Sequence, residues 1–307
     1  MKRVVITGAT GMIASALIRK LIKEDIQVLA ICRPNSSKIS NIPSHKLVTI
    51  CESDVSDLLH LKTVIKDTYD TFFHFAWNGT YGSSRNDAYL QTNNIKYTLD
   101  AVDLANHLGC TTFIGAGSQA EYGRTESKLS ALTPTNPENG YGIAKYTAGK
   151  LSAIYAKQLG LKHIWTRILS IYGPCDNDFT MIMSSILKML RGEYAAFTKG
   201  EQQWDFLYCD DAAEAFYRIA KEGKDGSVYP IGSGSTKSLA EYITIMRDTI
   251  NKNLKIGLGE VPYTQNQVMN LCADISELTK DTGFVPQISF EKGISETIDW
   301  CKHKIIG

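Results

Sequence analysis

The chain has 307 residues, of which 43% are hydrophobic and 21% charged, and its 33 basic and 32 acidic residues leave a net charge of +1. This balance is ordinary for a soluble globular protein and argues against electrostatic capture of nucleic acid or of an anionic membrane. No apolar run reaches the ~20 residues that a membrane-spanning helix needs. The seven cysteines form no C-x-x-C pair, which favours a reduced, cytoplasmic protein without structural zinc.

The first 170 residues alternate between strand-like and helix-like segments. Short apolar or β-branched runs predict strands at 3–7, 26–33, 46–54, 70–77, 111–118 and 161–173. Longer periodic segments predict helices at 16–25, 58–67, 92–109 and 140–160. Strands that alternate with helices indicate a parallel sheet with both faces covered, so we expect an α/β, doubly wound fold of the Rossmann type.

After Gly173 the pattern changes, which predicts a smaller C-terminal α/β substrate domain. Helices are expected at 177–193, 214–223, 239–252, 275–286 and 290–304, with a short strand at 194–200. The strand at 228–234 is expected to return to the main sheet. The predicted dinucleotide-binding domain therefore spans 1–170 and is rejoined at about 210–235, and the substrate-binding domain spans 171–209 and 236–307. The active site should lie between them, outside the carboxyl ends of the strands.

Two glycines stand at the first predicted strand-to-helix turn. Gly8 and Gly11 follow the first strand and precede a helix, and Ala14 completes a G-x-x-G-x-x-A spacing. Glycine there lets the backbone approach a pyrophosphate, and the helix N-terminus offers free N–H groups and a partial positive charge. In this βαβ context the turn favours dinucleotide binding over a plain tight turn.

The end of the second predicted strand bears on the choice of dinucleotide. NAD enzymes often place an acid there for the ribose 2′-OH, whereas NADP enzymes accommodate a 2′-phosphate with arginine. The stretch LAICRPNSSK has no acid but contains Arg33, Ser36, Ser37 and Lys38. These side chains can hydrogen-bond or pair with a phosphate, although solvated loop charges of this kind are common. The missing acid favours NADP(H), with NAD(H) as the alternative.

Tyr141 precedes Lys145 by four residues in a helix-like segment, so the two side chains share one face. A phenol keeps its proton up to a pH of about 10, and a fixed ammonium beside it would lower that pKa. The pair is typical of proton transfer, but this spacing also occurs by chance in many chains. The rest of the chain has to decide between the two interpretations.

In their order and spacing, the motifs resemble those of the extended short-chain dehydrogenase/reductase family, in its NAD(P)-dependent sugar-nucleotide epimerase, dehydratase and reductase branch. The resemblance covers nearly the whole chain. It is carried by TGATGMIA at 7–14, Asp54-Val55, FHFAW at 73–77, Asn94, FIGAGSQAEYG at 113–123, Tyr141, Lys145, RILSIYGP at 167–174 and WDFLYCDDAAEAF at 204–216.

The resemblance implies a role for each site residue. Tyr141 would transfer a proton, Lys145 would hold the nicotinamide ribose, and Ser118 would hydrogen-bond the reacting sugar oxygen. Asp54 and Val55 would hold the adenine end of the cofactor. The cofactor-binding residues that we expect are Gly8, Thr10, Gly11, Met12, Ile13, Arg33, Ser36, Lys38, Asp54, Val55, Phe75, Ala76, Trp77, Asn94, Tyr141, Lys145 and Ile168.

The residues after Ser118 bear on the reaction. Family dehydratases carry an Asp-Glu pair directly after the catalytic Ser or Thr, and here Gln119 and Ala120 stand in those positions. Without that acid–base pair a 4,6-dehydratase is not expected. Glu121 takes the place of a buried apolar residue and is expected to point elsewhere. The absence of an acid after the second strand favours a reductase that releases NADPH over an NDP-sugar C4-epimerase with bound NAD.

The substrate pocket departs from the family pattern at two positions. Ser170 replaces an asparagine and Trp204 replaces an arginine, both of which often contact the substrate diphosphate in the family. Trp204 either stacks on a base or sugar or packs under the C-terminal domain. The substrate-binding residues that we expect are Asn78, Arg85, Gln119, Ser170 and Trp204. The AWNGTYG and GSQAEYG segments resemble those of reductases acting on nucleotide-linked 4-keto-6-deoxy or dideoxy sugars.

The expected partner is a sugar nucleotide, with no nucleic acid, membrane or metal, and the resemblance implies a homodimer through two long helices. Some family members bind dinucleotide without catalysis, so a non-catalytic NADP(H) sensor or scaffold protein is the alternative from another class. Because the chain keeps both Tyr141 and Lys145, the enzyme is favoured.

Overall fold

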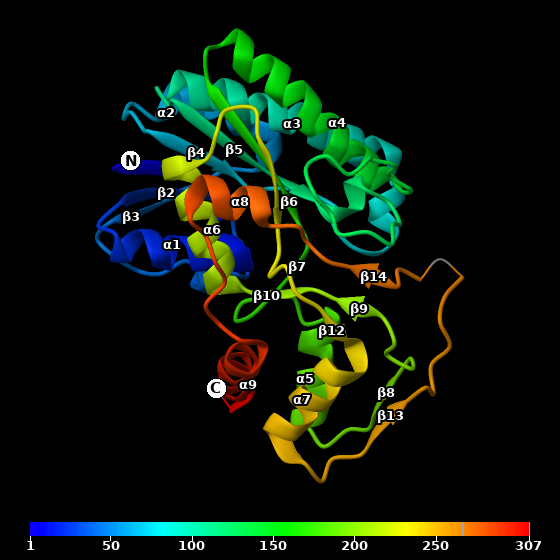
Figure 1. The fold of residues 1–307 in the computed structure, drawn as a ribbon. Coiled ribbons are helices and arrows are strands. Elements are labelled where there is room, and N and C mark those ends of the chain that lie inside the picture. Colours follow the sequence, from blue (N-terminus) through cyan, green and yellow to red (C-terminus); the bar gives the residue numbers. More distant parts are fainter. Residues whose placement is uncertain (266, 307) are drawn as a thin grey trace.

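A seven-stranded sheet, with neighbouring strands in the order β11-β6-β5-β4-β1-β2-β3, forms the centre of the larger part of the molecule. The computed structural model describes residues 1–265 and 267–306 (Figure 1). Every strand pair of this sheet is parallel, which confirms the doubly wound α/β fold. Its strands are β1 (Arg3–Thr7), β2 (Gln27–Cys32), β3 (Val48–Glu52), β4 (Thr71–His74), β5 (Thr112–Ser118), β6 (Lys162–Ile168) and β11 (Val228–Ile231).

Helices cover both faces of this sheet. Helices α1 (Met12–Lys23) and α6 (Cys209–Glu222) pack on each other over one face, and α3 (Ala88–His107) and α4 (Gly140–Gln158) cover the other. Strand β1 shows the division, because successive side chains of a strand point to opposite faces. Val4 and Ile6 join the core with α1 and α6, whereas Val5 joins the core with α3.

Two predicted elements differ in the structure. The helix expected at 58–67 is replaced by the end of a 3₁₀ segment, η2 (Val55–His60), and the single turn α2 (Leu61–Val64), with residues 65–67 outside any helix. Asp57 has φ −119° and ψ 20°, which breaks the helical path. The strand expected at 161–173 is two strands, because β6 ends at Ile168 and β7 (Ser170–Tyr172) pairs instead with β10 (Phe206–Tyr208).

The smaller part of the molecule lies beyond the carboxyl ends of the large sheet (Figure 1). It holds α5 (Met181–Leu190), α7 (Leu239–Asn251) and α9 (Phe290–Ile306), which contact one another. Its short strands are β8 (Ala195–Phe197), β9 (Gln203–Trp204), β12 (Lys237–Ser238), β13 (Ile256–Leu258) and β14 (Asn270–Leu271). Helix α8 (Ser276–Thr282) packs against α6 and β11 of the larger part. Within the described ranges, no helix is long and apolar enough to cross a membrane.

Candidate active site

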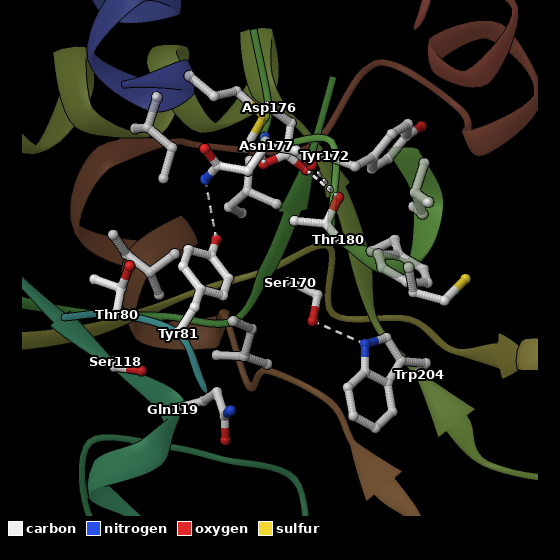
Figure 2. A pocket seen from close by; sticks show the side chains of 18 of the residues that line it. Thr80, Tyr81, Ser118, Gln119, Ser170, Tyr172, Asp176, Asn177, Thr180 and Trp204 are labelled. Carbon is white, nitrogen blue, oxygen red and sulfur yellow. Dashed lines mark hydrogen bonds between the residues drawn. The ribbon is translucent and has the colours of Figure 1, made fainter. Parts of the chain in front are cut away.

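A cavity of about 790 Å³ lies where the sheet strands end and the smaller part begins. It is bordered by the β1–α1 turn, the loop after β4, the end of β5, the first turns of α4 and the segments around β7, β8 and β9. Figure 2 shows the part of the wall that holds Ser118, Ser170 and Trp204. Ser118, Tyr141 and Lys145 all line it, as do Gly8 and Gly11. The structure therefore brings the three predicted catalytic residues and the glycine turn to one cavity.

Ser118 is held at the end of β5 by a buried glutamate. The backbone N–H of Ser118 donates to Glu121 Oε1 at 2.8 Å, and the Ser118 hydroxyl accepts from the N–H of Ala120 at 3.2 Å. Glu121, only 1% exposed, also accepts from Trp165 Nε1 at 3.0 Å and from Arg167 Nε at 2.8 Å. Both Glu121 oxygens are thus engaged away from the cavity, which confirms that this side chain points elsewhere.

Tyr141 and Lys145 lie on the first turns of α4, whose N-terminus is capped by the Asn139 side chain. The Lys145 ammonium donates to the carbonyl oxygen of Ala116 at 2.6 Å and lies 3.7 Å from the centre of the Trp77 ring. Burial lowers the pKa of Lys145 to about 7, because a charged ammonium is costly away from water.

The electrostatics of Tyr141 differ from the expectation. Burial raises the pKa of its phenol to about 12, opposed by a hydrogen bond to the Ser118 side chain and by the charge of Arg85. The expected lowering of this pKa by Lys145 is not found, because the ammonium faces Ala116 and Trp77 instead. Tyr141 is therefore a protonated phenol at neutral pH.

The β1–α1 turn fits a dinucleotide. Gly8 has φ +68°, and a Cβ on it would lie 2.8 Å from the backbone nitrogen of Ala76. Gly11 precedes the first residue of α1, so the N–H groups of that helix start face the turn. Met12, Ile13, Phe75, Trp77 and Ile168 also line the cavity. Only glycine leaves this space open, so the residues present fit a bound pyrophosphate.

The predicted adenosine-binding residues lie outside the cavity lining. Arg33 is exposed, and its charge contributes to lowering the pKa of Asp54, which is chiefly lowered by hydrogen bonds from Ser56. The Lys38 ammonium donates to the side chain of Asn177 in the smaller part. Ser36 accepts weakly from the Lys38 N–H at 3.4 Å, Thr10 accepts through its carbonyl from Asn41, and Val55 is buried. Contacts of these residues with the cofactor stay predictions.

Asn94 has a structural role that the sequence did not indicate. Its buried amide accepts from the N–H of Asn78 at 3.0 Å and donates to the carbonyl of the same residue at 2.8 Å. Gln91, one turn earlier on α3, accepts from Trp77 Nε1 at 3.0 Å. These two amides fix the loop after β4, so they place Trp77 under Lys145. Gln91 was not predicted, since nothing in a helical Gln signals a loop contact.

Four of the predicted substrate-binding residues, Arg85, Gln119, Ser170 and Trp204, line the cavity, whereas Asn78 does not. Trp204 Nε1 donates to Ser170 Oγ at 2.8 Å (Figure 2). The wall around Trp204 is mostly aromatic or aliphatic, with Phe197, Phe206, Leu239, Ile243 and Val261.

The structure adds lining residues that were not predicted. Tyr81 from the β4 loop accepts from the Asn177 side chain at 3.4 Å, and Thr180 donates to the Asp176 carboxylate at 2.9 Å (Figure 2). Among the described residues that line the cavity, Asp176 has the one carboxyl group. Burial raises its pKa to about 6. Asp176, Asn177 and Thr180 lie in the irregular segment before α5, where a helix was expected from residue 177, and Tyr81 lies in the loop after β4.

The fold and the site together define a Rossmann-type protein whose serine, tyrosine and lysine meet at a dinucleotide-binding turn. The chain belongs to the NAD dependent epimerase/dehydratase family, which it matches over residues 4–232.

Among curated proteins, the chain is 29% identical over 97% of its length to a trifunctional UDP-glucose 4,6-dehydratase/UDP-4-keto-6-deoxy-D-glucose 3,5-epimerase/UDP-4-keto-L-rhamnose-reductase of Arabidopsis thaliana. It covers 47% of that relative, so the chain spans about half the length of the protein it matches. It is 26% identical to CDP-abequose synthase of Salmonella muenchen, with 97% of each chain covered.

Solved structures of similar shape span the whole chain. The UDP-N-acetylglucosamine 4-epimerase of Methanobrevibacter ruminantium M1 superposes with a TM-score of 0.90 at 25% identity, with 99% of each chain covered. A UDP-glucuronic acid 4-epimerase of Bacillus cereus gives a TM-score of 0.85 at 23% identity, with 98% of this chain and 99% of that one covered. The second likeness shows the fold alone.

Proposed function

We propose that the chain is an NADPH-dependent reductase that acts at C4 of a nucleotide-linked 4-keto-6-deoxy or dideoxy hexose, in deoxysugar or surface-polysaccharide biosynthesis. The observation that carries the proposal is the Tyr141 phenol, held by Ser118 in the same cavity as the Gly8–Gly11 turn. The relatives named for a keto-sugar reductase and for CDP-abequose synthase support this substrate class.

The residues would divide the reaction between them. The cofactor, when bound, supplies a hydride to the carbonyl carbon. Tyr141 gives its phenol proton to the carbonyl oxygen as charge develops there, and Ser118 donates a hydrogen bond that orients that oxygen. Because burial keeps Tyr141 protonated, it is ready to act as the acid in the direction of reduction. Lys145 lies one helical turn away, where it would hold the nicotinamide ribose.

Loss of water from the sugar is not proposed, although several relatives are 4,6-dehydratases by name. That reaction needs an acid and a base beside the sugar. Gln119 lines the cavity without a titratable group, Ala120 has none, and both oxygens of Glu121 are held by Ser118, Trp165 and Arg167. Among the described lining residues Asp176 is the remaining carboxyl group, and it accepts hydrogen bonds from the Thr180 hydroxyl and the N–H of Asn177.

The proposed preference for NADPH rests on the loop after β2. Arg33 is exposed there beside Asp54, and the loop offers Ser36 and Lys38 but no acid before Glu52 on the neighbouring strand β3. A 2′-phosphate would gain a charge-assisted hydrogen bond from the guanidinium. Titrating the protein with NADPH and NADH while following nicotinamide fluorescence tests this: Arg33→Ser should weaken NADPH binding and leave NADH binding nearly unchanged.

A C4-epimerase is the second candidate, because the UDP-N-acetylglucosamine 4-epimerase named above superposes on 99% of this chain. Such an enzyme would oxidise the sugar, let it turn in the cavity and reduce the other face, with no net change in cofactor. A non-catalytic NADP(H)-binding protein is the third. Tyr141→Phe separates this last case, since a sensor would keep its binding behaviour and an enzyme would lose turnover.

A homodimer in the cytoplasm is also proposed. Helices α3 and α4 carry exposed apolar side chains, with Tyr89 87%, Ile143 51% and Ile154 58% exposed. Exposed apolar side chains on two neighbouring helices favour association of two copies. Light scattering on Ile154→Glu, compared with the parent chain, tests this: a dimer through these helices should dissociate.

The deciding assay follows absorbance at 340 nm with NADPH or NADH and a panel of CDP-, dTDP-, UDP- and GDP-linked 4-keto-6-deoxy sugars. Oxidation of NADPH with one of them would establish the reductase and identify its substrate. Conversion of an unoxidised sugar nucleotide to its epimer, without net loss of cofactor, would establish the epimerase and overturn the reductase.

A further inference from the structure

Arg85 lies against the proposed proton donor, although it comes from a different element. Its guanidinium carbon is 4.4 Å from the centre of the Tyr141 ring. Arg85 belongs to the 3₁₀ segment η3 (Gly82–Asn86) after β4, whereas Tyr141 lies on α4. At this distance a cation over the ring face is attracted to the ring electrons.

Hydrogen bonds and close backbone contacts fix the position of Arg85 relative to Tyr141. Arg85 Nη1 donates to the carbonyl of Thr80 at 3.0 Å, so the guanidinium is tied to its own loop. The Asn86 side chain accepts from the N–H of Gly140 at 3.0 Å, and a Cβ on Gly140 would lie 2.9 Å from the carbonyl oxygen of Arg85. The η3 segment therefore docks directly on the first turn of α4, which fixes the guanidinium relative to the phenol.

Lys145 is less well placed for the same task. Its ammonium lies 5.8 Å from the centre of the Tyr141 ring and is directed to the Ala116 carbonyl and the Trp77 face. Burial lowers its pKa to about 7, so it loses charge as the pH rises through neutrality. A guanidinium keeps its charge throughout this range. Near and above neutral pH, Arg85 is thus the permanent cation next to the phenol.

We propose that Arg85 is a positioning residue that acts through Tyr141, holding its ring and stabilising the ionised phenol that remains after the proton has been given up. This inference rests on the proposed function for its role in turnover, but the ionisation of Tyr141 is measurable without a substrate. It also gives Arg85 a task beyond the substrate contact expected from the sequence.

Other groups also face Tyr141 and affect the ionisation of its phenol. The Ser118 hydroxyl from β5 favours the ionised phenol, whereas the Glu121 carboxylate from the turn after β5 and Tyr81 from the β4 loop oppose it. Trp77 meets the ring edge-on at 6.0 Å. None of these groups is a cation, and Glu121 is itself paired with Arg167 at 2.8 Å, so Arg85 is the cation whose guanidinium lies nearest the phenol ring among the groups named here. The ionisation of Tyr141 should therefore respond strongly to that charge.

The test places a difluorotyrosine at position 141, which brings the phenol titration toward neutral pH, and follows it by ¹⁹F NMR in the full chain with and without NADP⁺. Arg85→Gln keeps a donor for the Thr80 carbonyl and removes the charge, whereas Arg85→Lys keeps the charge. We expect Arg85→Gln to raise the titration midpoint by about one pH unit, a tenfold change in the ionisation constant, and Arg85→Lys to raise it less. Lys150→Gln is the matched control, because Lys150 lies 5.6 Å from the Tyr146 ring on the same helix and should change nothing at 141.

An unchanged midpoint in Arg85→Gln, with the fold intact by circular dichroism, would overturn the inference. So would a variant that raises KM for the sugar nucleotide while leaving both the midpoint and the pH profile of kcat as they were, since that pattern belongs to a residue that only binds substrate. If Arg85→Gln fails to fold, the titration midpoint of Arg85→Lys is compared with that of the parent chain. A small rise is then the expected result, and an unchanged midpoint would contradict the inference. A shifted midpoint without reduction of any keto-sugar would leave the inference standing and reject the proposed reductase.

Discussion

The indole N–H of Trp204 donates to the hydroxyl of Ser170 at 2.8 Å, and these are the two positions at which the substrate pocket departs from the family pattern. Ser170 begins β7 and Trp204 ends β9, so the bond crosses between two of the small sheets at the cavity wall. Taken one at a time, the two replacements looked like losses of substrate contacts. Together they form a pair in which each side chain is the hydrogen-bond partner of the other.

Removing both partners of this pair should cost less than the sum of the two single changes. Ser170→Ala leaves a half-buried indole N–H without its acceptor, which should lower the free energy of unfolding by about 1–2 kcal/mol. Trp204→Phe should be destabilising as well, but the double variant should show a coupling of about 1 kcal/mol in a double-mutant cycle. Urea denaturation measures all four proteins. Strict additivity of the two changes would show that the bond has no energetic weight.

Glu121 should prove necessary for stability and for the geometry of Ser118. Glu121→Gln removes the charge that faces Arg167, which is itself buried. Breaking a buried ion pair on one side costs about 3–5 kcal/mol, because the remaining charge is left without compensation. We expect that loss in denaturation experiments, together with a fall in kcat, since the Glu121 side chain holds the Ser118 backbone.

An exposed ion pair provides the control for Glu121. Glu138 pairs with Arg124 at 2.8 Å, but their side chains are 37% and 46% exposed. Glu138→Gln should therefore cost less than about 1 kcal/mol. Equal losses in Glu121→Gln and Glu138→Gln would contradict the assignment of Glu121 as the buried anchor of the site.

The sheet could be predicted because each of its strands leaves a strong local signal. Buried parallel strands are continuous apolar runs, and helices follow between them at short intervals. The strands β1, β2, β4 and β5 can therefore be predicted from the sequence. The end of β6 at Ile168 could not be predicted in this way. Leu169 is as apolar as its neighbours, and β7 leaves the large sheet only because β10, some 35 residues later, offers it a partner. Pairing with a distant segment is decided by tertiary structure.

The site divides in the same way. Ser118, Tyr141 and Lys145 were found because their spacing is tied to regular elements, a strand end and one helical face. Arg85 was predicted to reach the pocket, but its contact with the Tyr141 ring depends on how η3 docks on α4. The orientation of the Lys145 ammonium toward Ala116 depends on the depth at which the helix packs. Neither docking nor depth is encoded by spacing alone.

Gly8→Ala should abolish cofactor binding, whereas its effect on the free energy of unfolding should be modest. The new methyl group would meet the backbone of Ala76 at 2.8 Å and force the turn out of its φ of +68°. Gly160→Ala isolates the conformational part, since Gly160 has φ +74° with nothing within 4 Å of its added Cβ. Both variants should lose about 1–2 kcal/mol of stability from the left-handed backbone. NADPH titration should show loss of binding in Gly8→Ala alone, and full affinity there would contradict the proposed turn.

Lys145 should make stability depend on pH in a direction set by its lowered pKa. The folded-state pKa is about 7, against 10.5 for a lysine in water, so between these pH values the unfolded chain binds more protons than the folded one. The part of the free energy of unfolding that depends on this group therefore rises with pH across that window, by up to about 1.4 kcal/mol per pH unit.

The variant Lys145→Met removes this pH dependence. Urea denaturation at pH 7 and pH 8.5 should show a stability difference between Lys145→Met and the parent chain that changes by about 1–2 kcal/mol in favour of the parent at the higher pH. Comparison with the parent cancels the titration of the buried cysteines and tyrosines that both proteins share. Lys150→Met, an exposed change on the same helix, should track the parent at both pH values, and a Lys145→Met profile parallel to it would mean that the buried ammonium keeps an ordinary pKa.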